Sequence, residues 1–514
     1  MAKESGKAAV KTRFPPSPTG PFHMGNARTA LFNYLFTKKT GGTMVLRIED
    51  TDKERSKPEW EKDIVENLAW LGIQWDEGPI RQSDRTPIYK QYLEKLLEQG
   101  RAYYCFCSEE ELETQRQYQT SIGQAPRYSG QCRNLTREQT QENIEKKMPS
   151  VIRFVMESKT ATFNDLIRGQ VTFDTALIGD IVIAKDLSTP LYNFSVVIDD
   201  AQMNITHVIR GEDHLSNTPK QIILQEALGL KKPIYAHLPL ILAKDRTKLS
   251  KRHGDNSVTR FREEGYLPEA ILNFLALLGW NPGTDKEIFS LPQLIDEFSL
   301  ERIQKGGAVF NIQRLDWING FYIRQKSTEE ITTLCIPYLV GANLITPLWE
   351  DKIDNFDPFS WYWRQRKVVQ ENFRIDETKE VVSFKKIAEI VSLYQERLKK
   401  LSEIVELTDF FFRKELEYPT ELLYWKDATA QQTKENLAKL ETIVSAVGEG
   451  EWAKGKLEQE IMPEAEKEKN RGYMLWPFRV ALCGKKASAG PFEIAEILGK
   501  QKTFQRIQEA KNKL

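Results

Sequence analysis

The stretch TRFPPSPTGPFHMGN, Thr12 to Asn26, joins a short extended segment to the first helical pattern of the chain. It holds four prolines, two glycines and His23, which is one of five histidines in 514 residues. The prolines fix the path of the backbone, the glycines allow close approach, and the helix that follows presents free N–H groups at its start. The stretch therefore predicts a rigid anion-binding turn in which His23 can donate a hydrogen bond to phosphate oxygens.

The pattern around this turn is that of an α/β protein. A helical pattern over 26–36 is followed by a buried strand over 44–50 and by an amphipathic helix over 58–71 that opens with a proline. From 108 to about 185 polar helices and short strands interrupt the alternation, which resumes with a strand over 204–211. We expect a parallel sheet of the Rossmann type that is split by an α+β insertion.

The last third of the chain has almost only helical patterns beyond about residue 325, with Lys and Glu on the outer faces, so we expect it to be all-α. We expect two halves of a catalytic domain at 1–107 and 191–245, the insertion at 108–190, a region with a basic loop at 246–325, and a helical region at 326–514 divided near 415. The aromatic run FSWYW at 359–363 fits a core segment, with an exposed stacking surface as the alternative.

Composition bounds the class of protein. Lys plus Arg and Asp plus Glu number 73 each, so there is no net field to attract DNA, and a nucleic-acid partner must be held by local basic patches. The longest apolar stretch, 270–280, is shorter than the ~20 residues that span a bilayer. The first ten residues lack the apolar segment of a secretory signal. We therefore expect a cytoplasmic protein with no membrane or DNA partner.

A second basic motif lies far along the chain. The segment KDRTKLSKRHG, Lys244 to Gly254, follows an apolar strand and places four cations between Arg246 and Arg252. A solvated basic face is one explanation. A loop of this kind that faces the His23 turn across the carboxyl ends of parallel strands would instead stabilise a departing pyrophosphate. The two motifs together favour the second explanation.

The two motifs and their flanks resemble a known family. HMGN at 23–26 and KLSKR at 248–252 are similar to the HIGH and KMSKS signatures of class I aminoacyl-tRNA synthetases. RFPPSPTG at 13–20, LRIEDTD at 46–52, WLGIQWDEGP at 70–79 and VIRGEDHLSNTP at 208–219 resemble glutamyl-tRNA synthetase of the bacterial and organellar type. Asn26 stands where the general class signature has its second histidine, a position that varies among glutamyl enzymes, and Arg252 replaces the final serine of KMSKS, as is usual for glutamyl enzymes. The resemblance extends from about Thr12 to the C-terminus and is densest before Phe321.

This resemblance implies an ATP-dependent ligase that attaches L-glutamate to tRNA(Glu) in two steps, through glutamyl-adenylate, with release of AMP and pyrophosphate. Its catalytic residues would be His23, Lys248 and Lys251, which stabilise phosphate charge. The resemblance places ATP and its Mg²⁺ against Pro16, Ser17, Thr19, Gly20, His23, Gly25, Asn26, Lys248, Ser250 and Lys251. It places glutamate against Arg13, Ser17, Glu49, Tyr192 and Arg210.

Elementary chemistry agrees with the glutamate site. A dicarboxylate needs two cationic partners, which Arg13 and Arg210 supply, and its ammonium group needs a carboxylate, which Glu49 supplies. The alternative is an internal salt bridge, for instance between Arg13 and Glu49.

The resemblance also implies the contacts with tRNA. The insertion from Ser108 would contact the acceptor end, the region at 246–325 the stem, and the helical C-terminal region the anticodon, by stacking and arginine contacts to splayed bases. Arg397 is a candidate anticodon-reading residue, with a solvated helix face as the alternative. Whether tRNA(Gln) is also charged stays open, and the family implies a monomer.

A cysteine cluster is the one candidate metal site. Cys105 and Cys107 are followed by Cys132, and in zinc-containing members of the family a histidine comes two positions later, where this chain has Asn134. Three thiolates without a fourth good ligand make a poor structural zinc site. We therefore expect no structural zinc.

Four other functions fit parts of the sequence. A glutaminyl-tRNA synthetase shares the catalytic motifs but should have a β-rich C-terminal part. A glutamyl-queuosine paralogue would lack the last third, and an α/β nucleotidylyltransferase would explain only the first motif. A non-catalytic RNA-binding relative is the remaining alternative, although the chain retains both His23 and Lys251.

Overall fold

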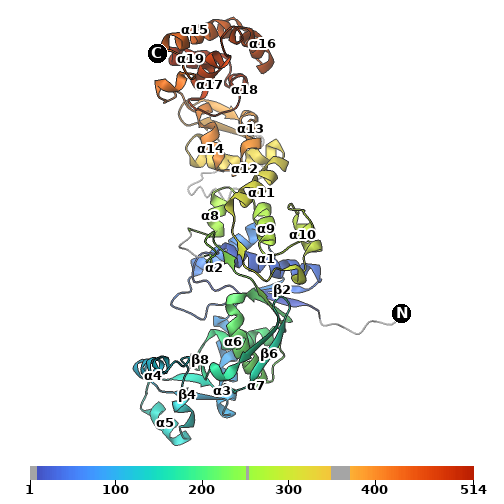
Figure 1. Ribbon diagram of the computed structural model, residues 1–514, viewed down its shortest axis with the longest axis vertical. Coiled ribbons are helices and arrows are strands. Elements are labelled where there is room, and N and C mark those ends of the chain that lie inside the picture. The colour runs from blue at the N-terminus through green and yellow to red at the C-terminus, as the bar shows by residue number, and fades with distance from the viewer. Residues whose placement is uncertain (1–8, 250–253, 349–370) are drawn as a thin grey trace, which may run out of the picture. The chain divides into compact units, whose positions relative to one another are not determined.

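The computed structural model describes residues 9–249, 254–348 and 371–514. The chain folds into two compact units, Met1–Arg262 with Pro268–Leu315, and Glu263–Leu267 with Asp316–Leu514 (Figure 1). The predicted boundary at 325 falls at the end of α11 (Ile312–Gln325), whereas the second unit already resumes at Asp316. Ser250 and Lys251, like the FSWYW run, lie outside the described residues. No helix in the described ranges is long and apolar enough to cross a membrane.

A parallel sheet forms the centre of the first unit. β1 (Lys11–Phe14), β2 (Thr43–Ile48) and β3 (Glu77–Arg81) pair in parallel, in that order. β10 (His207–Gly211) and β11 (Ile234–Leu238) are also parallel to each other, and Thr206 N donates to Lys11 O at 2.9 Å next to β1. Strands from both sides of the insertion thus meet in the order β3, β2, β1, β10, β11. This confirms the prediction of a split Rossmann-type sheet.

Helices cover this sheet and hold its loops. α1 (Met24–Lys39) buries ten of its 16 residues, so the turn that precedes it is attached to a helix buried on most of its surface. α2 (Pro58–Trp70) and α7 (Thr218–Leu228) both begin with a proline in the first turn, where a missing N–H costs nothing. The further helices of this unit that follow the sheet are α8 (Val258–Glu263), α9 (Pro268–Leu277) and α10 (Leu291–Glu297).

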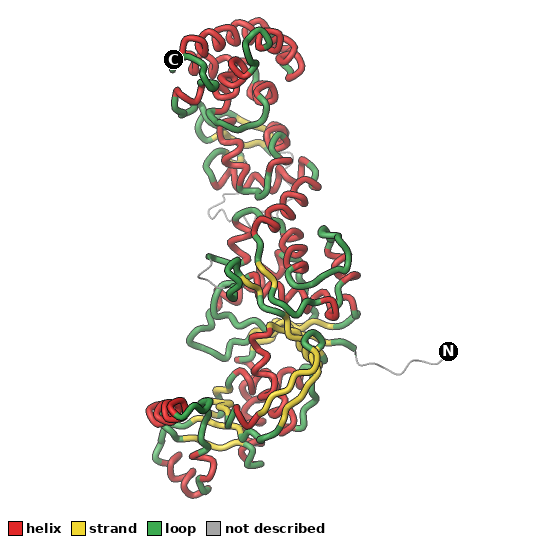
Figure 2. Tube along the Cα trace, in the orientation of Figure 1, coloured by secondary structure: helices red, strands yellow, loops and turns green. Residues whose placement is uncertain are grey.

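The insertion carries its own antiparallel sheet and two exposed helices (Figure 2). The sheet consists of β4 (Ala102–Cys105), β5 (Val151–Phe154), β8 (Ile181–Asp186) and β9 (Thr189–Pro190), and the helices are α4 (Glu109–Ser121) and α5 (Arg137–Glu145). Its strands share a core with α3 (Thr86–Glu98) and α6 (Tyr192–Gln202), for example Phe154 with Phe194. Because β4 pairs with β5, this sheet begins ahead of the predicted start at Ser108.

A hairpin of the insertion also reaches the central sheet. β6 (Thr160–Asp165) and β7 (Gly169–Asp174) pair along their whole length, and Asp165 at the end of β6 pairs in parallel with Tyr235 of β11. The insertion is therefore attached to the edge of the catalytic sheet at β11.

The second unit confirms the helical C-terminal region. Beyond α11, its described α-helices are α12 (Thr328–Gly341), α13 (Phe384–Ser392), α14 (Glu403–Thr408), α15 (Ala430–Ala446), α16 (Lys454–Ala465), α17 (Gly472–Cys483), α18 (Pro491–Leu498) and α19 (Lys500–Asn512). It also contains an antiparallel sheet of β14 (Ile345–Pro347), β15 (Asn372–Ile375) and β16 (Val381–Ser383), which the all-α expectation missed. Strands of three or four residues are too short to show a period of two. Arg397 is exposed beside Tyr394, and its role stays a prediction, as does the division near 415.

Candidate active site

A cavity of about 1310 Å³ lies where the central strands end. Its walls come from the turn after β1, from the segment after β2, from the start of α6 and from the end of β10. Eleven of the predicted site residues line it: Arg13, Pro16, Ser17, Thr19, His23, Gly25, Asn26, Glu49, Tyr192, Arg210 and Lys248. Gly20 lies in the same turn but does not line the cavity. Ser250 and Lys251 lie outside the described ranges.

His23 caps the first turn of α1. Its Nδ1 accepts the backbone N–H of Asn26 at 3.3 Å, so the proton of a neutral ring is on Nε2. The side chain is exposed, and an added Cβ at Gly25 would lie 3.1 Å from the imidazole ring. The turn thus holds a hydrogen-bond donor above a helix N-terminus, which is the arrangement that an anionic ligand needs.

The segment that follows the basic motif is attached to this turn. Met24 N donates to Asn256 O at 3.0 Å, and Val258 N donates to Phe22 O at 2.8 Å. Ahead of the motif, β12 (Ile241–Leu242) forms a bridge to Lys248. Lys248 is more than half exposed and its Nζ lies 3.0 Å from Asp213 Oδ2. The structure therefore brings the two predicted motifs to the same cavity.

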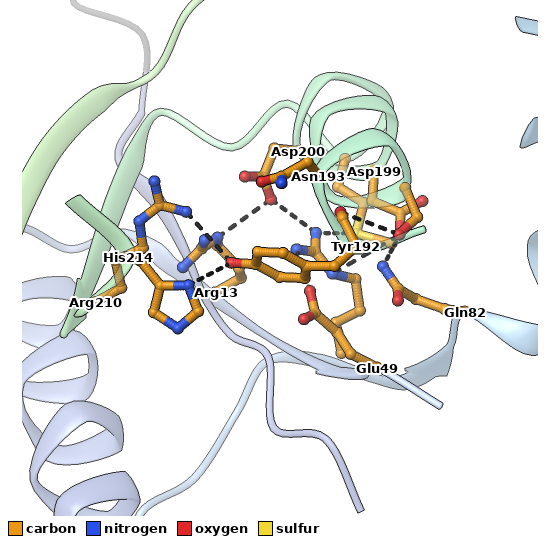
Figure 3. Close-up of polar contacts among 12 residues, drawn as sticks. Arg13, Glu49, Gln82, Tyr192, Asn193, Asp199, Asp200, Arg210 and His214 are labelled. Carbon is orange, nitrogen blue, oxygen red and sulfur yellow. Dashed lines mark hydrogen bonds and ion pairs between the residues drawn. The ribbon is translucent and has the colours of Figure 1, made fainter. Parts of the chain in front are cut away.

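A buried network of charges includes Arg13 and Glu49, which both line the cavity (Figure 3). Arg13 Nε donates to Asp200 Oδ1 at 3.1 Å, and Arg47 Nη1 donates to the same oxygen at 2.8 Å. Arg47 Nη2 donates to Glu49 Oε1 at 3.1 Å. Both residues therefore form internal ion pairs, as the alternative expected, but Arg13 pairs with Asp200 and Glu49 with Arg47 instead of with each other.

This network leaves binding capacity directed at the cavity. Arg13 is 1% exposed, and its Nη1 has no hydrogen-bond partner among the described residues. Burial raises the pKa of Glu49, and the charges of Arg47 and Arg13 oppose that rise. Burying a carboxylate and a guanidinium that has an unpaired N–H costs free energy, unless a ligand forms the missing hydrogen bonds and ion pairs. Both groups line the cavity, where a ligand with charges of both signs would do so.

Arg210 forms the second cationic wall. Its Nη1 lies 3.4 Å from the Tyr192 hydroxyl, and its Nη2 donates to Thr218 Oγ1 at 2.8 Å. The Tyr192 hydroxyl is also 3.0 Å from His214 Nδ1 (Figure 3). Burial and the charge of Arg210 lower the pKa of His214 to about 4, so this ring is neutral at pH 7. Arg210 is thus held by neutral partners, and its positive charge is available to an anion.

Sequence reasoning missed several members of this site: Arg47, Asp199, Asp200, Asn193 and His214. Asp199 and Asp200 end the apolar run SVVID of α6, and both are buried. An acidic pair at the end of a buried helix face is a signal that a partner cation exists, but it does not say which one. Asp199 accepts from Gln82, Arg85 and Tyr89 at 2.7 to 2.8 Å, and these donors come from a different part of the chain.

The cysteine cluster lies in the insertion, apart from the cavity. The sulfur atoms of Cys105, Cys107 and Cys132 lie within 4.8 Å of one another. The Tyr128 hydroxyl lies 3.4 Å from Cys105 Sγ and 3.4 Å from Cys107 Sγ, and it accepts Cys132 N at 2.9 Å. Burial raises the pKa of Cys107 to about 12. Four possible donor atoms therefore converge, one more than the sequence analysis counted.

Comparisons with known proteins agree with this geometry. Residues 9–317 match the family model "tRNA synthetases class I (E and Q), catalytic domain", and residues 356–511 match "Anticodon binding domain". The chain is 44% identical to a glutamate–tRNA ligase of Carboxydothermus hydrogenoformans, over 98% of this chain and 100% of that protein. It is 45% identical to glutamate–tRNA ligase 1 of Caldicellulosiruptor saccharolyticus, over 97% of this chain and 98% of that protein.

A solved structure gives the same result. A glutamate–tRNA ligase from Elizabethkingia meningosepticum, crystallised in complex with its amino acid, is 33% identical with a TM-score of 0.80, over 98% of this chain and 99% of that one. These comparisons and the helical C-terminal region do not favour a glutaminyl enzyme. A catalytic-domain match over more than half the chain and relatives of this identity show that the chain belongs to the glutamate–tRNA ligase family of class I tRNA synthetases.

Proposed function

We propose that this enzyme attaches L-glutamate to tRNA(Glu) at the expense of ATP, and that the cavity at the strand ends is its active site. One observation carries the proposal. Two buried guanidinium groups, Arg13 and Arg210, and one buried carboxylate, Glu49, line the same cavity. A glutamate molecule has two carboxylates and one ammonium group, which complement these three charges.

The site residues divide the ligand between them. Arg13 offers its unused Nη1 to one carboxylate, Arg210 with the Tyr192 hydroxyl binds the other, and Glu49 accepts from the ammonium group. Ser17, exposed on the turn, is a further neutral donor at this end. The pocket is pre-organised, because Asp200 and Arg47 hold Arg13 and Glu49 before any ligand binds.

ATP, with Mg²⁺, binds along the His23 turn in this proposal. The α-carboxylate of glutamate attacks the α-phosphorus, the bond to the bridging oxygen breaks, and pyrophosphate leaves with its electron pair. His23 donates from Nε2, and Lys248 supplies positive charge as negative charge shifts to the pyrophosphate. Lys251 and Ser250 complete this loop in the sequence-based proposal. No side chain has to form a covalent bond.

In the second step a terminal ribose hydroxyl of tRNA, by class I resemblance the 2′ oxygen, attacks the carbonyl carbon of glutamyl-adenylate, and AMP leaves. The insertion reaches the cavity through β8 and β9, whose Val182, Lys185, Thr189 and Pro190 line it, so it is the part of the first unit suited to hold the acceptor end. The region that matches an anticodon-binding domain would read the anticodon. The monomeric state stays an expectation from the family resemblance.

The sequence predicts no structural zinc because a fourth ligand is missing, and the Tyr128 hydroxyl changes this interpretation: we propose that it completes a zinc site with the three cysteines. Thiolates are ligands that structural zinc takes, and the three sulfur atoms already lie within 4.8 Å of one another. Zinc would tie the end of β4 to the segment around Cys132, and no step of the ligation depends on it. Metal analysis of the purified enzyme should find stoichiometric zinc, with less retained by Tyr128→Phe, whereas an enzyme purified without chelators that holds no zinc would contradict this assignment.

Charging of separately purified tRNAs tests the proposed activity. With radiolabelled glutamate and MgATP we expect label on tRNA(Glu), and the same assay with tRNA(Gln) measures how far the anticodon region restricts the substrate. A folded enzyme that charges neither tRNA would overturn the proposal and favour a non-catalytic RNA-binding role.

A further inference from the structure

A buried row of polar groups connects the insertion to Arg210. Asp165, the last residue of β6, and His237, in β11, both have fully buried side chains. Asp165 Oδ2 lies 2.6 Å from His237 Nδ1, and on the far side of the ring Arg210 Nε donates to His237 Nε2 at 3.1 Å. Three residues from three strands thus form one chain of contacts that ends at the cavity.

The geometry defines the tautomer of His237. A guanidinium nitrogen can only donate, so His237 Nε2 must be the unprotonated acceptor. The ring proton is therefore on Nδ1, from which it is donated to Asp165 Oδ2. Thr218 Oγ1, which accepts from Arg210 Nη2 at 2.8 Å, lies 3.1 Å from the same His237 Nε2. The imidazole is a neutral acceptor that fixes the angle of the Arg210 guanidinium.

Asp165 is itself held firmly. Its Oδ1 accepts the backbone N–H groups of Ile167 and Arg168 at 2.9 and 2.8 Å, and its Oδ2 accepts His237 N at 3.0 Å. Arg168, three residues after Asp165, forms an ion pair with Glu212, and its Nη1 donates to Lys305 O at 2.7 Å. The turn after β6 is thus locked to the catalytic sheet on several sides, and the carboxylate cannot rotate away from the ring.

We propose that Asp165, a residue of the insertion, is a positioning residue for amino-acid recognition: through the neutral His237 it holds Arg210 in the orientation that binds a substrate carboxylate. This inference rests on the proposed role of Arg210 as a glutamate ligand. It assigns to the β6–β7 hairpin a function in selecting the amino acid, in addition to any contact with tRNA.

Asp165→Asn is the most informative variant. The new amide has one oxygen and one NH₂ group in place of two acceptors. If the amide oxygen accepts the N–H groups of Ile167 and Arg168, the NH₂ group faces His237 Nδ1. His237 Nδ1 must then accept a hydrogen bond from that NH₂ group. The ring proton moves to Nε2 and opposes the N–H of Arg210. The change is isosteric, yet it reverses the polarity of the ring, as the wrong tautomer does in other carboxylate–histidine pairs.

The test compares Michaelis constants in tRNA(Glu) charging. Asp165→Asn should raise the KM for glutamate by about tenfold or more, with the KM for ATP changed by less than about twofold. Asp180→Asn is the matched control: it is another buried carboxylate of the insertion, and it accepts from the Tyr103 hydroxyl at 2.7 Å and from Met156 N at 2.8 Å. Its side-chain partners in the described part of the chain include neither Arg210 nor His237. It should leave both constants near their original values.

A spectroscopic measurement does not depend on a variant that folds. With ¹⁵N-labelled histidine, of which the chain has only five, the full-length enzyme should show one histidine that is protonated at Nδ1 and whose signal is lost in His237→Gln. Protonation of that ring at Nε2 in the unaltered enzyme would overturn the inference.

The outcomes separate this inference from the proposed function. An original enzyme that does not charge tRNA with glutamate refutes the function itself. An original enzyme that charges normally, with an Asp165→Asn variant whose glutamate KM is unchanged, refutes only the positioning role. A rise of both Michaelis constants by the same factor would show a general structural defect and would also count against it.

Discussion

Arg13 Nε lies 3.1 Å from Asp200 Oδ1, and this ion pair is almost completely buried. The same oxygen receives Arg47 Nη1, so one carboxylate holds two cations that lie on neighbouring strands. Burial disfavours the charged form of Asp200, but the Arg13 and Arg47 charges lower its pKa below the ordinary value. Asp200 thus fixes the position of Arg13, which lines the cavity, and offsets the positive charge of Arg47.

Asp200→Asn should therefore damage both stability and binding. Removing one partner from a buried charge network costs about 3–5 kcal/mol of unfolding free energy, because Arg13 loses its counter-charge and Arg47 keeps only Glu49 and Asp199. Urea unfolding measures this loss. Glu113→Gln, which breaks an exposed pair with Arg116, is the control and should cost less than about 1 kcal/mol. Equal losses in the two variants would contradict the importance of the buried network.

Glu49 predicts a pH dependence of glutamate binding. Burial raises its pKa above the ordinary 4.5, against the opposing charges of Arg47 and Arg13, while nearby Asp200 adds to the rise. Only the ionised form can accept from an ammonium group, so the KM for glutamate should rise on acidification before an ordinary glutamate would titrate. Glu49→Gln should raise the KM by about 10–100-fold, the value of a charge-assisted hydrogen bond, and remove this acid limb. A variant that keeps the limb would assign it to another group.

His214 predicts a pH dependence of stability. Its pKa in the folded protein is about 4, against 6.5 ordinarily, because of burial and of Arg210 and Arg13, with Asp213 opposing. Between these values the unfolded chain binds a proton that the folded chain does not. The contribution of His214 to the free energy of unfolding is therefore complete above pH 6.5. It is lost as the pH falls to about 4, and the total loss is about 3 kcal/mol. His214→Gln should lose less stability between pH 7 and 4.5 than the original enzyme, and an equal loss would refute the assignment.

His23 is the N-cap of α1 and, in this proposal, a donor to phosphate, and one variant can separate these two roles. Asparagine is a good N-cap residue, so His23→Asn should keep the start of α1 while losing the longer reach of Nε2. We expect kcat to fall by about 10²–10³ with the KM for glutamate within about twofold, because the lost donor acts on phosphate charge in the transition state. Single-turnover adenylate formation measures this directly. Retention of kcat would show that His23 serves only the helix.

The local parts of the site could be predicted from sequence, and the distant pairings could not. The His23 turn follows from a short motif between a strand and a helix, where the order of elements determines what meets, whereas Arg13 and Glu49 are predicted from the family resemblance. Asp200 was missed because it lies 153 residues from Arg47, across the insertion. Tyr128 was missed for a similar reason: a ligand was sought after Cys132, whereas the fold brings one from before it.

The fold, too, has parts that could be predicted from the sequence and parts that could not. Helices such as α1 and α2 and the buried six-residue strand β2 are long enough for the sequence to show their type, and that type was confirmed. The sheet of β14 to β16 has strands of three or four residues, which carry no periodic signal. The membership of β4 in the sheet of the insertion depends on its pairing with Val151–Phe154, some fifty residues later, and no local pattern reports that pairing.

The most direct test of the account is a competition between two amino acids that differ by one charge. Equimolar glutamate and glutamine, each with its own radiolabel, are supplied with MgATP and purified tRNA(Glu), and the label esterified to tRNA is measured for the original enzyme and for Arg210→Gln. The account predicts that the original enzyme esterifies glutamate and excludes glutamine, and that Arg210→Gln esterifies much less glutamate while the Asp180→Asn enzyme keeps the original amount. Esterification of glutamine as readily as glutamate by the original enzyme would contradict a pocket built around two guanidinium groups.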